Sequence, residues 1–423
     1  MRNRLNLFRE CISDDDNECL VYGTDNLSQF TLANGLIASK CDRALPAARS
    51  NDVVVLRGNL DQEYQSWLRS LGLGTDHILA YGESSRKKTL SQVIVENPEP
   101  VQRIIQAMNK KPVYVPWFSS EAEEMAAISI GADLFGAPAT LTWKYNEKSI
   151  FKNVCRQLDI PMVDDTVFFL HPEEKKNVLE MDEIIQSYLP DTSTVLIRGT
   201  LDNTGRSLVF KTSGDDIHVL YNQILKLGVT KIIIEPFLNV TSSPNDQWII
   251  TREKKIRHLG KRDQICKNGT CHIATIKQRE PDSTELQYIK KTSLSLVNDM
   301  ADQGYVGVIG IDYIVTDSGI YPVENNARFN GSSYVSLIVN NIEALTGIVP
   351  CWKFIKVKTK PCSFNMLSKR LRPILFNGQL SESVFPYNCD NLDKTGAFAV
   401  ILMGPDIERL AELELILNAM GIE

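Results

Sequence analysis

The stretch that decides the fold runs from Gly307 to Phe329 and reads GVIGIDYIVTDSGIYPVENNARF. An apolar, β-branched run interrupted by one acid, Asp312, leads to a turn at TDSG, and a polar second strand follows. This pattern predicts a β-hairpin. Because side chains alternate between the two faces of a strand, Glu324, Asn326 and Arg328 are expected on one face. Antiparallel pairing across the turn would bring Asp312 close to Glu324.

Two carboxylates and an amide oxygen on one face suit a hard cation. Mg²⁺ prefers oxygen ligands and binds one or two protein acids beside substrate phosphates. Asp312, Glu324 and Asn326 are therefore candidate metal ligands, with Mn²⁺ as an alternative ion. On spacing alone, a hairpin with a solvated polar face accounts for the same residues at least as well.

The composition is that of an ordinary globular protein. The chain has 423 residues, a length that suggests two or three domains. Of these residues 43% are hydrophobic and 23% are charged, and the net charge is −6. This charge gives no general attraction to nucleic acid or to an anionic membrane. No apolar run approaches the ~20 residues of a membrane span, and the charged N-terminus is not typical of a secretory signal. The nine scattered cysteines indicate reduced thiols in a cytoplasmic protein.

The order of predicted elements divides the chain into three parts. Strands alternate with helices over residues 1–139, which indicates a parallel sheet covered by helices. Residues 140–345 contain an amphipathic helix, further strands and the hairpin, and form a second domain. Residues 346–423 contain a basic stretch and a closing strand–helix segment, GAFAVILMGPDIERLAELELILNAMG.

Individual elements are predicted from hydrophobic period and turn signals. Strands are expected at 51–58, 76–82, 111–117, 193–199, 207–211, 231–237 and 247–253. Helices are expected near 119–131, 172–188, 215–228 and 283–303.

The hairpin resembles the metal-binding strand pair of the ATP-grasp superfamily, in which an acid precedes a Glu-x-Asn-x-Arg signature by about a dozen residues. The resemblance continues upstream, in the same order as in that family. NEKSIFKNVCRQLDIP places Lys148 at the start of a helix that ends before Pro161. STVLIRG ends a strand in Arg198, where the family usually has lysine, and the following loop contains Gly205. IIIEPFL supplies an acid and a hinge.

This resemblance covers roughly residues 140–345 and implies roles for residues that bind ATP. Lys148 and Arg198 would contact the phosphates, and the loop with Gly205 would cover them. The backbone N–H of Leu238 would read adenine, with Glu235 beside the exocyclic amine. The ribose hydroxyls would be bound by the next acid along the chain, Asp246.

The fold implied is α/β: an ATP-grasp domain (140–345) between a Rossmann-like pre-ATP-grasp domain (1–139) and a small C-terminal strand–helix lid (346–423). The whole arrangement resembles the peptide-forming carboxylate–amine ligases of natural-product pathways. ATP would phosphorylate a small-molecule carboxylate, and an amine, free or carrier-bound, would attack the acyl phosphate. Arg328 would face the carboxylate or the developing acyl phosphate. A homodimer is expected by the same resemblance.

The residue patterns also leave alternative functions and roles open. A biotin-carboxylase-like enzyme that activates bicarbonate is the alternative among enzymes, and a non-catalytic ATP-binding module is the alternative outside them. Lys148 could be an exposed helix lysine, Arg198 a surface strand residue and Asp246 a plain loop acid. Arg328 could form a structural ion pair with Glu324.

Overall fold

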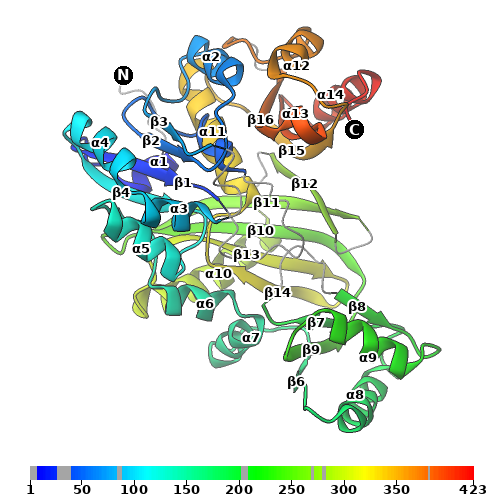
Figure 1. Cartoon of the computed structure of the whole chain (residues 1–423). Coiled ribbons are helices and arrows are strands. Elements are labelled where there is room, and N and C mark those ends of the chain that lie inside the picture. The colour runs from blue at the N-terminus through cyan, green and yellow to red at the C-terminus, as the bar shows by residue number, and fades with distance from the viewer. Residues whose placement is uncertain are drawn as a thin grey trace.

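The computed structural model describes residues 7–25, 40–82, 88–201, 208–267, 271–278, 283–379 and 382–423. These residues form three sheets (Figure 1). In the view of Figure 1, the N-terminal sheet lies at the upper left, and a small lobe built on a four-stranded sheet lies at the lower right. A long sheet between them carries the hairpin.

The N-terminal sheet has five parallel strands. Their order is β3 (Ile78–Ala80), β2 (Val53–Leu56), β1 (Glu18–Gly23), β4 (Lys111–Pro116) and β5 (Asp133–Leu134). The four residues of β2 are all buried, as expected for a parallel strand covered on both faces. The helical elements of this part are α1 (Leu7–Ile12), η1 (Cys41–Ala44), α2 (Gln62–Ser70), α3 (Leu90–Glu96), α4 (Glu99–Met108) and α5 (Glu121–Ser129).

The prediction of a parallel α/β domain is confirmed. The predicted strands correspond to β2, β3 and β4, and the predicted capped helix is α5. A capping box formed by Ser120 and Glu123 begins that helix. Strand β1 was missing from the predicted elements, although its sequence, ECLVYG, is apolar apart from its ends.

The central sheet has eight strands. Their order is β14 (Gly319–Asn326), β13 (Gly307–Thr316), β10 (Val240–Ile250), β11 (Ile256–Lys267), β12 (Cys271–Gln278), β15 (Cys351–Lys358), β17 (Ala397–Gly404) and β16 (Ser383–Asn391). Each neighbouring pair is antiparallel. The C-terminal segment therefore extends the sheet of the hairpin, and the division of the chain into three domains stays a prediction.

Two helices cover opposite faces of this sheet near the hairpin. On one face, α10 (Thr284–Asp302) contacts β13 through Tyr313, whose hydroxyl lies 2.8 Å from Ser293 Oγ. On the other face, α11 (Gly331–Thr346) follows the hairpin and packs toward the N-terminal domain. The two helices belong to different apolar clusters. Leu337 and Ile338 of α11 share one cluster with the N-terminal strands, and Leu296 of α10 belongs to another.

The small lobe has a four-stranded antiparallel sheet. Its order is β6 (Thr166–Phe169), β9 (Lys231–Pro236), β7 (Val195–Gly199) and β8 (Leu208–Lys211). Helices α8 (Glu174–Tyr188) and α9 (Ile217–Lys226) pack on it around their own apolar cluster. The predicted strands and helices of this region are confirmed.

The remaining helices are α6 (Ala139–Asn146), α7 (Lys148–Gln157), α12 (Phe364–Leu371), α13 (Leu392–Thr395) and α14 (Ile407–Ala419). Helix α7 begins where the chain enters the small lobe and contacts β14. In the described part of the chain, no helix combines the length and apolar character needed to cross a bilayer.

Candidate active site

The hairpin pairs its two acids directly. Asp312 of β13 is the register partner of Glu324 of β14, and Gly310 is the partner of Asn326. Residues paired across an antiparallel ladder point to the same face, so the predicted approach of the two carboxylates is confirmed. The turn at residues 316–319 also lies where the sequence predicts it.

Asp312 is held by three amide side chains. Its Oδ1 accepts hydrogen bonds from Asn245 Nδ2 (2.6 Å) and Gln264 Nε2 (2.5 Å), and its Oδ2 accepts one from Asn326 Nδ2 (2.8 Å). Asn245 and Gln264 come from β10 and β11, so four strands build the environment of one carboxylate. Neither residue was predicted. Asn245 ends the segment VTSSPN, which precedes the strand predicted at 247–253 but belongs to β10.

The pKa of Asp312 is raised to about 6. Burial is the main cause, the charge of Glu324 adds to it, and hydrogen bonds from Asn245 and Asn326 and the charge of Arg328 oppose it. Two like charges that face each other in a buried place favour a cation between them. Among the described residues, no group of three or more His, Cys, Asp or Glu side chains is placed to hold a metal. Two carboxylates and the amide oxygen of Asn326 are ligands of the kind that Mg²⁺ accepts.

Arg328 does not lie on the strand face where it was predicted. Strand β14 ends at Asn326, and the backbone N–H of Arg328 folds back to donate to the Asn326 carbonyl (2.8 Å). The chain leaves the ladder because the next residues must turn into α11. The alternation between strand faces does not extend to Arg328. Its guanidinium still feels the charges of Glu324 and Asp312, which raise its pKa against a larger lowering by burial.

Lys148 is the first residue of α7, as predicted, and is only 2% exposed. Its Nζ lies 3.6 Å from Glu324 Oε1. This excludes an exposed helix lysine and places a positive charge beside the paired acids. Helix α7 is fixed in place because Glu147, its N-cap, accepts from the N–H of Ile150 and forms a 2.7 Å ion pair with Lys231.

Arg198 and Glu235 form a buried ion pair inside the small lobe. Arg198 Nε lies 2.9 Å from Glu235 Oε1, and Lys152 Nζ lies 2.8 Å from Glu235 Oε2. Burial raises the pKa of Glu235, but Arg198 and Lys152 lower it by more, so the pKa lies below 4.5. Arg198 is therefore no surface residue. It also donates to the carbonyl of Val323 in β14 (3.2 Å), which joins the lobe to the hairpin.

Lys152 was not predicted from the sequence. It lies four residues after Lys148 on α7 and is 1% exposed. Residues four apart share a face of a helix, so a second lysine on the face of Lys148 was the signal that could have found it.

Three further residues were predicted to bind ATP: Leu238, Gly205 and Asp246. Leu238 lies in the short connection between β9 and β10, half-buried. Gly205 falls within 202–207, outside the described residues. Asp246 is a fully buried residue of β10, held by His258 Nε2 (2.6 Å) and Trp248 Nε1 (2.7 Å). It follows Asn245 in the strand and so faces the opposite side of the sheet from Asp312. The structure does not bring it together with the other site residues.

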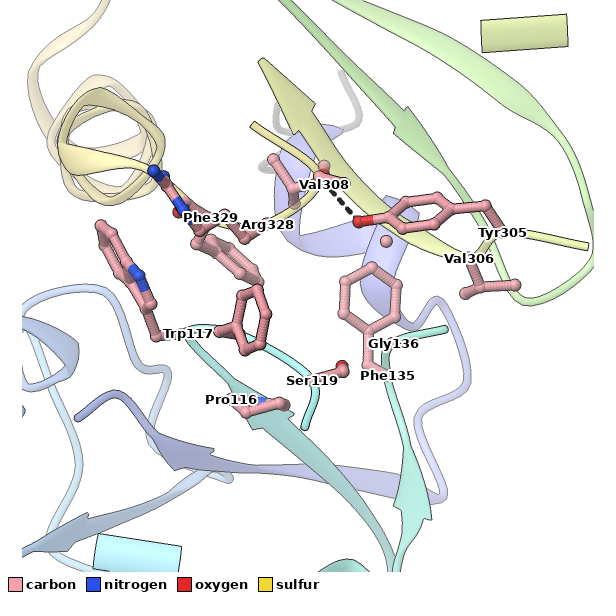
Figure 2. A pocket seen from close by; sticks show the side chains of 13 residues that line it. Pro116, Trp117, Ser119, Phe135, Gly136, Tyr305, Val306, Val308, Arg328 and Phe329 are labelled. Carbon is pink, nitrogen blue, oxygen red and sulfur yellow. Dashed lines mark hydrogen bonds between the residues drawn. The ribbon is translucent and has the colours of Figure 1, made fainter. Parts of the chain in front are cut away.

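A small cavity lies between the N-terminal domain and the end of the hairpin (Figure 2). Its volume is about 10 Å³, which is about the space of one water molecule. Trp117 and Phe118, just after β4, line it together with Arg328 and Phe329. The guanidinium carbon of Arg328 lies 5.7 Å from the centre of the Trp117 ring. The predicted catalytic arginine therefore lies at the seam between the domains.

Solved structures identify the fold. Biotin carboxylase from Campylobacter jejuni superposes with a TM-score of 0.61 over 96% of this chain and 92% of its own, at 11% sequence identity. An N5-carboxyaminoimidazole ribonucleotide synthetase in complex with ADP superposes with a TM-score of 0.59 over 95% of this chain and 97% of its own, at 12% identity. The fold is ATP-grasp. The five-stranded parallel sheet is its N-terminal pre-ATP-grasp domain, as predicted.

A third similar structure was solved with ligands bound. The biotin carboxylase domain dimer of 2-oxoglutarate carboxylase from Hydrogenobacter thermophilus, in complex with MgADP, ADP and bicarbonate, superposes with a TM-score of 0.59 at 12% identity, over 96% of this chain and 90% of its own. No protein-family model matches the chain, and no curated protein matches it in sequence. The comparisons therefore define an ATP-grasp architecture and leave the reaction to be inferred from the site.

Proposed function

We propose that this protein is an ATP-dependent carboxylate–amine ligase. The observation that carries this proposal is the pairing of Asp312 with Glu324, with Asn326 on the same hairpin and Lys148 3.6 Å from Glu324. Phosphoryl transfer requires alignment and charge neutralisation more than covalent help from the protein. A pair of facing acids for Mg²⁺ and a buried lysine beside them supply both.

In the proposed reaction, an oxygen of the substrate carboxylate attacks the γ-phosphorus of ATP, and the bond to the β,γ-bridging oxygen breaks. This gives an acyl phosphate and ADP. An amine then attacks the acyl carbon, the amide bond forms, phosphate leaves with the electrons of the acyl–oxygen bond, and the proton that the amine loses passes to phosphate or solvent. Mg²⁺, when bound, supplies Lewis-acid stabilisation of the phosphate oxygens.

The roles of the residues follow from their positions. Asp312, Glu324 and Asn326 would hold the metal, and Lys148 would place its charge on the phosphates. Arg328 would contact the carboxylate and stabilise the negative charge that develops on it.

The proposal assigns the nucleotide to the side of the small lobe. Leu238 lies where β9 leads into β10, and its backbone N–H is the proposed contact to adenine. Because Arg198 and Lys152 both pair with Glu235, the proposed role of Glu235 is to hold these two cations near the nucleotide. The flap over the phosphates, which includes Gly205, stays a prediction, and so does the assembly of the chain as a homodimer.

A bicarbonate-activating enzyme is a second candidate, because the similar structures over nearly the whole chain include a biotin carboxylase and a carboxyaminoimidazole synthetase. The ligase is favoured by the surroundings of Arg328. The aromatic side chains of Trp117 and Phe118 lie beside it, and apolar neighbours suit the carbon chain of an organic acid better than bicarbonate.

One assay separates these functions. The purified chain is incubated with ATP and Mg²⁺, with hydroxylamine as a trap for acyl phosphate, and with either a panel of amino and organic acids or bicarbonate. Hydroxamate formation with an organic acid supports the ligase. ADP release that depends on bicarbonate alone supports the second candidate. Background release in every well would contradict both.

Arg328→Lys tests the contact with the acid substrate. Lysine keeps the charge but loses the planar fork that binds a carboxylate through two hydrogen bonds. We expect kcat/KM for the acid to fall roughly 10- to 100-fold, which corresponds to about 1.4–2.8 kcal/mol, while ATP affinity stays within about twofold. Calorimetric titration with ATP and steady-state kinetics measure the two effects. Arg257→Lys, at an exposed position of β11, is the control. Loss of ATP affinity in Arg328→Lys would reassign the residue to the nucleotide.

The pH dependence of metal binding tests Asp312. Its pKa of about 6 lies above the ordinary value of 3.8, so the carboxylate is mostly protonated below pH 6 and cannot ligate a cation. We expect the affinity for Mn²⁺, measured by electron paramagnetic resonance, to be constant above pH 7 and to fall up to tenfold per pH unit below 6. The dependence should disappear in Asp312→Asn, at a lower overall affinity. A flat wild-type profile between pH 5 and 7 would show that Asp312 is not a ligand.

A further inference from the structure

Near the cavity, which Trp117 lines, three side chains carry buried polar atoms that have no hydrogen-bond partner among the described residues. These are Arg43 Nη2, Trp117 Nε1 and the Tyr334 hydroxyl, in residues that are 3%, 6% and 0% exposed. Buried polar groups are nearly always paired in folded proteins. Three orphaned groups in one place therefore require a physical reason.

These three side chains contact one another. The guanidinium carbon of Arg43 lies 4.1 Å from the centre of the Trp117 ring and 5.3 Å from that of the Tyr334 ring. The two rings are stacked, with centres 5.9 Å apart. Arg43 comes from η1 and Trp117 follows β4, both in the N-terminal domain, whereas Tyr334 belongs to α11. The cluster of Arg43, Trp117 and Tyr334 thus lies at the same seam as Arg328.

Among the described residues, no carboxylate forms an ion pair with Arg43, and the charges of Asp25 and Asp42 act on it only from farther away. The Nε of Arg43 donates to the carbonyl of Lys40 (2.8 Å). The adjacent acid, Asp42, accepts instead from the N–H of Cys389, and burial raises the pKa of Asp42, which favours its neutral form. A buried guanidinium without an acid is costly. An anionic ligand would supply the missing charge.

Arg43 and Arg328 are neighbours, because both guanidinium groups lie over the ring of Trp117. The positive charge of Arg43 also lowers the pKa of Arg328, in addition to a larger effect of burial. The charges of Asp312 and Glu324 raise the pKa of Arg328 and so oppose this lowering. Arg43 itself belongs to η1, in the N-terminal domain. The site therefore has two arginines: Arg328, near Asp312 and Glu324, and Arg43, on the side of the N-terminal domain.

We propose that Arg43, with Trp117 Nε1–H and the Tyr334 hydroxyl, binds a second carboxylate of the substrate pair, one that takes no part in the reaction. The substrates would then include either a dicarboxylic acid as the donor or an amino acid with a free carboxylate as the acceptor. Arginine matches a carboxylate through parallel N–H donors, and the indole and phenol supply further donors to the same group. The reaction itself rests on the proposed function, but the binding of a carboxylate at Arg43 does not.

The first test measures binding without catalysis. Thermal unfolding of the whole chain is followed with sodium glutarate or, at equal ionic strength, sodium chloride. We expect glutarate to raise Tm by a few degrees in the wild type and to have no effect in Arg43→Met, and Trp117→Phe and Tyr334→Phe should weaken the effect. An equal shift in the wild type and in Arg43→Met, or no shift in the wild type, would overturn the proposal and leave buried water as the partner of these polar atoms.

Stability without ligand provides a second, independent measurement. If Arg43 is kept for a ligand, methionine should fill its place over Trp117 and remove an unbalanced charge, so Tm should stay constant or rise. If Arg43 instead stabilises the fold, its replacement by methionine should lower Tm. Arg9→Met is the matched control, because Arg9 is also buried in this domain but forms a 2.8 Å ion pair with Asp52, and its replacement should lower Tm. A fall in Arg43→Met as large as that in Arg9→Met would overturn the proposal.

Kinetics then locate the carboxylate on one substrate. For the donor, glutarate is compared with its monoamide in the hydroxylamine assay. For the acceptor, glycine is compared with glycinamide, using a donor acid that the assay has identified. We expect a roughly 100-fold preference for the free carboxylate in one comparison, and its loss in Arg43→Met. If both preferences survive in Arg43→Met, the assignment fails. If glutarate binds through Arg43 but no acid supports turnover, the carboxylate site stands and the ligase proposal fails.

Discussion

Replacing Glu324 by glutamine should lower the rate of ATP turnover by at least 10³-fold while the protein stays folded. Glu324 is the register partner of Asp312 and lies 3.6 Å from Lys148. The substitution keeps the shape of the side chain but removes the negative charge that would attract the metal. Loss of one such electrostatic contact costs about 10²–10³ in rate, and loss of a metal ligand adds to this.

The experiment compares Glu324→Gln with Asp317→Asn. Asp317 lies in the turn of the same hairpin and is exposed, so its variant should retain the full rate. ADP release under saturating ATP and Mg²⁺ gives the rate, and circular dichroism with thermal unfolding reports the fold. Near-normal turnover in Glu324→Gln would contradict the assignment of the metal site. Loss of the fold would instead give this residue a structural role.

The largest expected effect on stability is at Glu235. Its two carboxylate oxygens pair with Arg198 and Lys152 in the interior of the small lobe, and all three side chains are at least 93% buried. Glu235→Gln leaves Arg198 without its carboxylate partner. Removing one partner of a buried ion pair typically costs about 3–5 kcal/mol, so the variant should unfold at clearly lower denaturant concentration.

Denaturant unfolding tests this expectation, with Glu183→Gln as the control. Glu183 is exposed on α8 of the same lobe, so its variant should change stability by less than about 0.5 kcal/mol. Adding Arg198→Met to Glu235→Gln should recover part of the loss, because the unpaired charge is removed as well. Equal stability of Glu235→Gln and the wild type would show that the pair contributes nothing.

The stabilisation by Glu235 also depends on pH in a defined direction. The pKa of Glu235 in the folded protein lies below 4.5, so its contribution to stability is present above that value. It is lost as the pH falls through the lowered pKa. The difference in unfolding free energy between wild type and Glu235→Gln should therefore shrink in acid. An unchanged difference at low pH would contradict the role of the ion pair.

Sequence patterns alone were enough to predict the architecture and the hairpin that is proposed to bind the metal. Strand–helix alternation predicted the parallel sheet, since such a sheet needs helices on both faces. The period of two along a strand predicted that Glu324 and Asn326 share a face, and the turn at residues 316–319 set the pairing of Asp312 with Glu324. These features depend on residues close together in the chain, and local geometry is what a sequence pattern encodes.

The tertiary structure alone decided which distant residues complete the site. Asn245 and Gln264 reach Asp312 because β10 and β11 lie next to the hairpin in the sheet, although they are 67 and 48 residues away in the chain. Asp246 was predicted in the site but lies outside it. Because β10 includes VTSSPN, the side chain of Asp246 lies on the face of the sheet opposite to Asp312. No period in the sequence specifies the order of strands that are joined by long connections.

The same physical reason applies to Arg43. Nothing around it in the sequence distinguishes it from a surface arginine, and it lies 285 positions before Arg328 in the chain. Only the packing of the N-terminal domain against α11 buries it beside Trp117 and Tyr334, where no described acid forms an ion pair with it. Local sequence thus specified the hairpin where the metal is proposed to bind, and the contact between domains specified the place where the second carboxylate is proposed to bind.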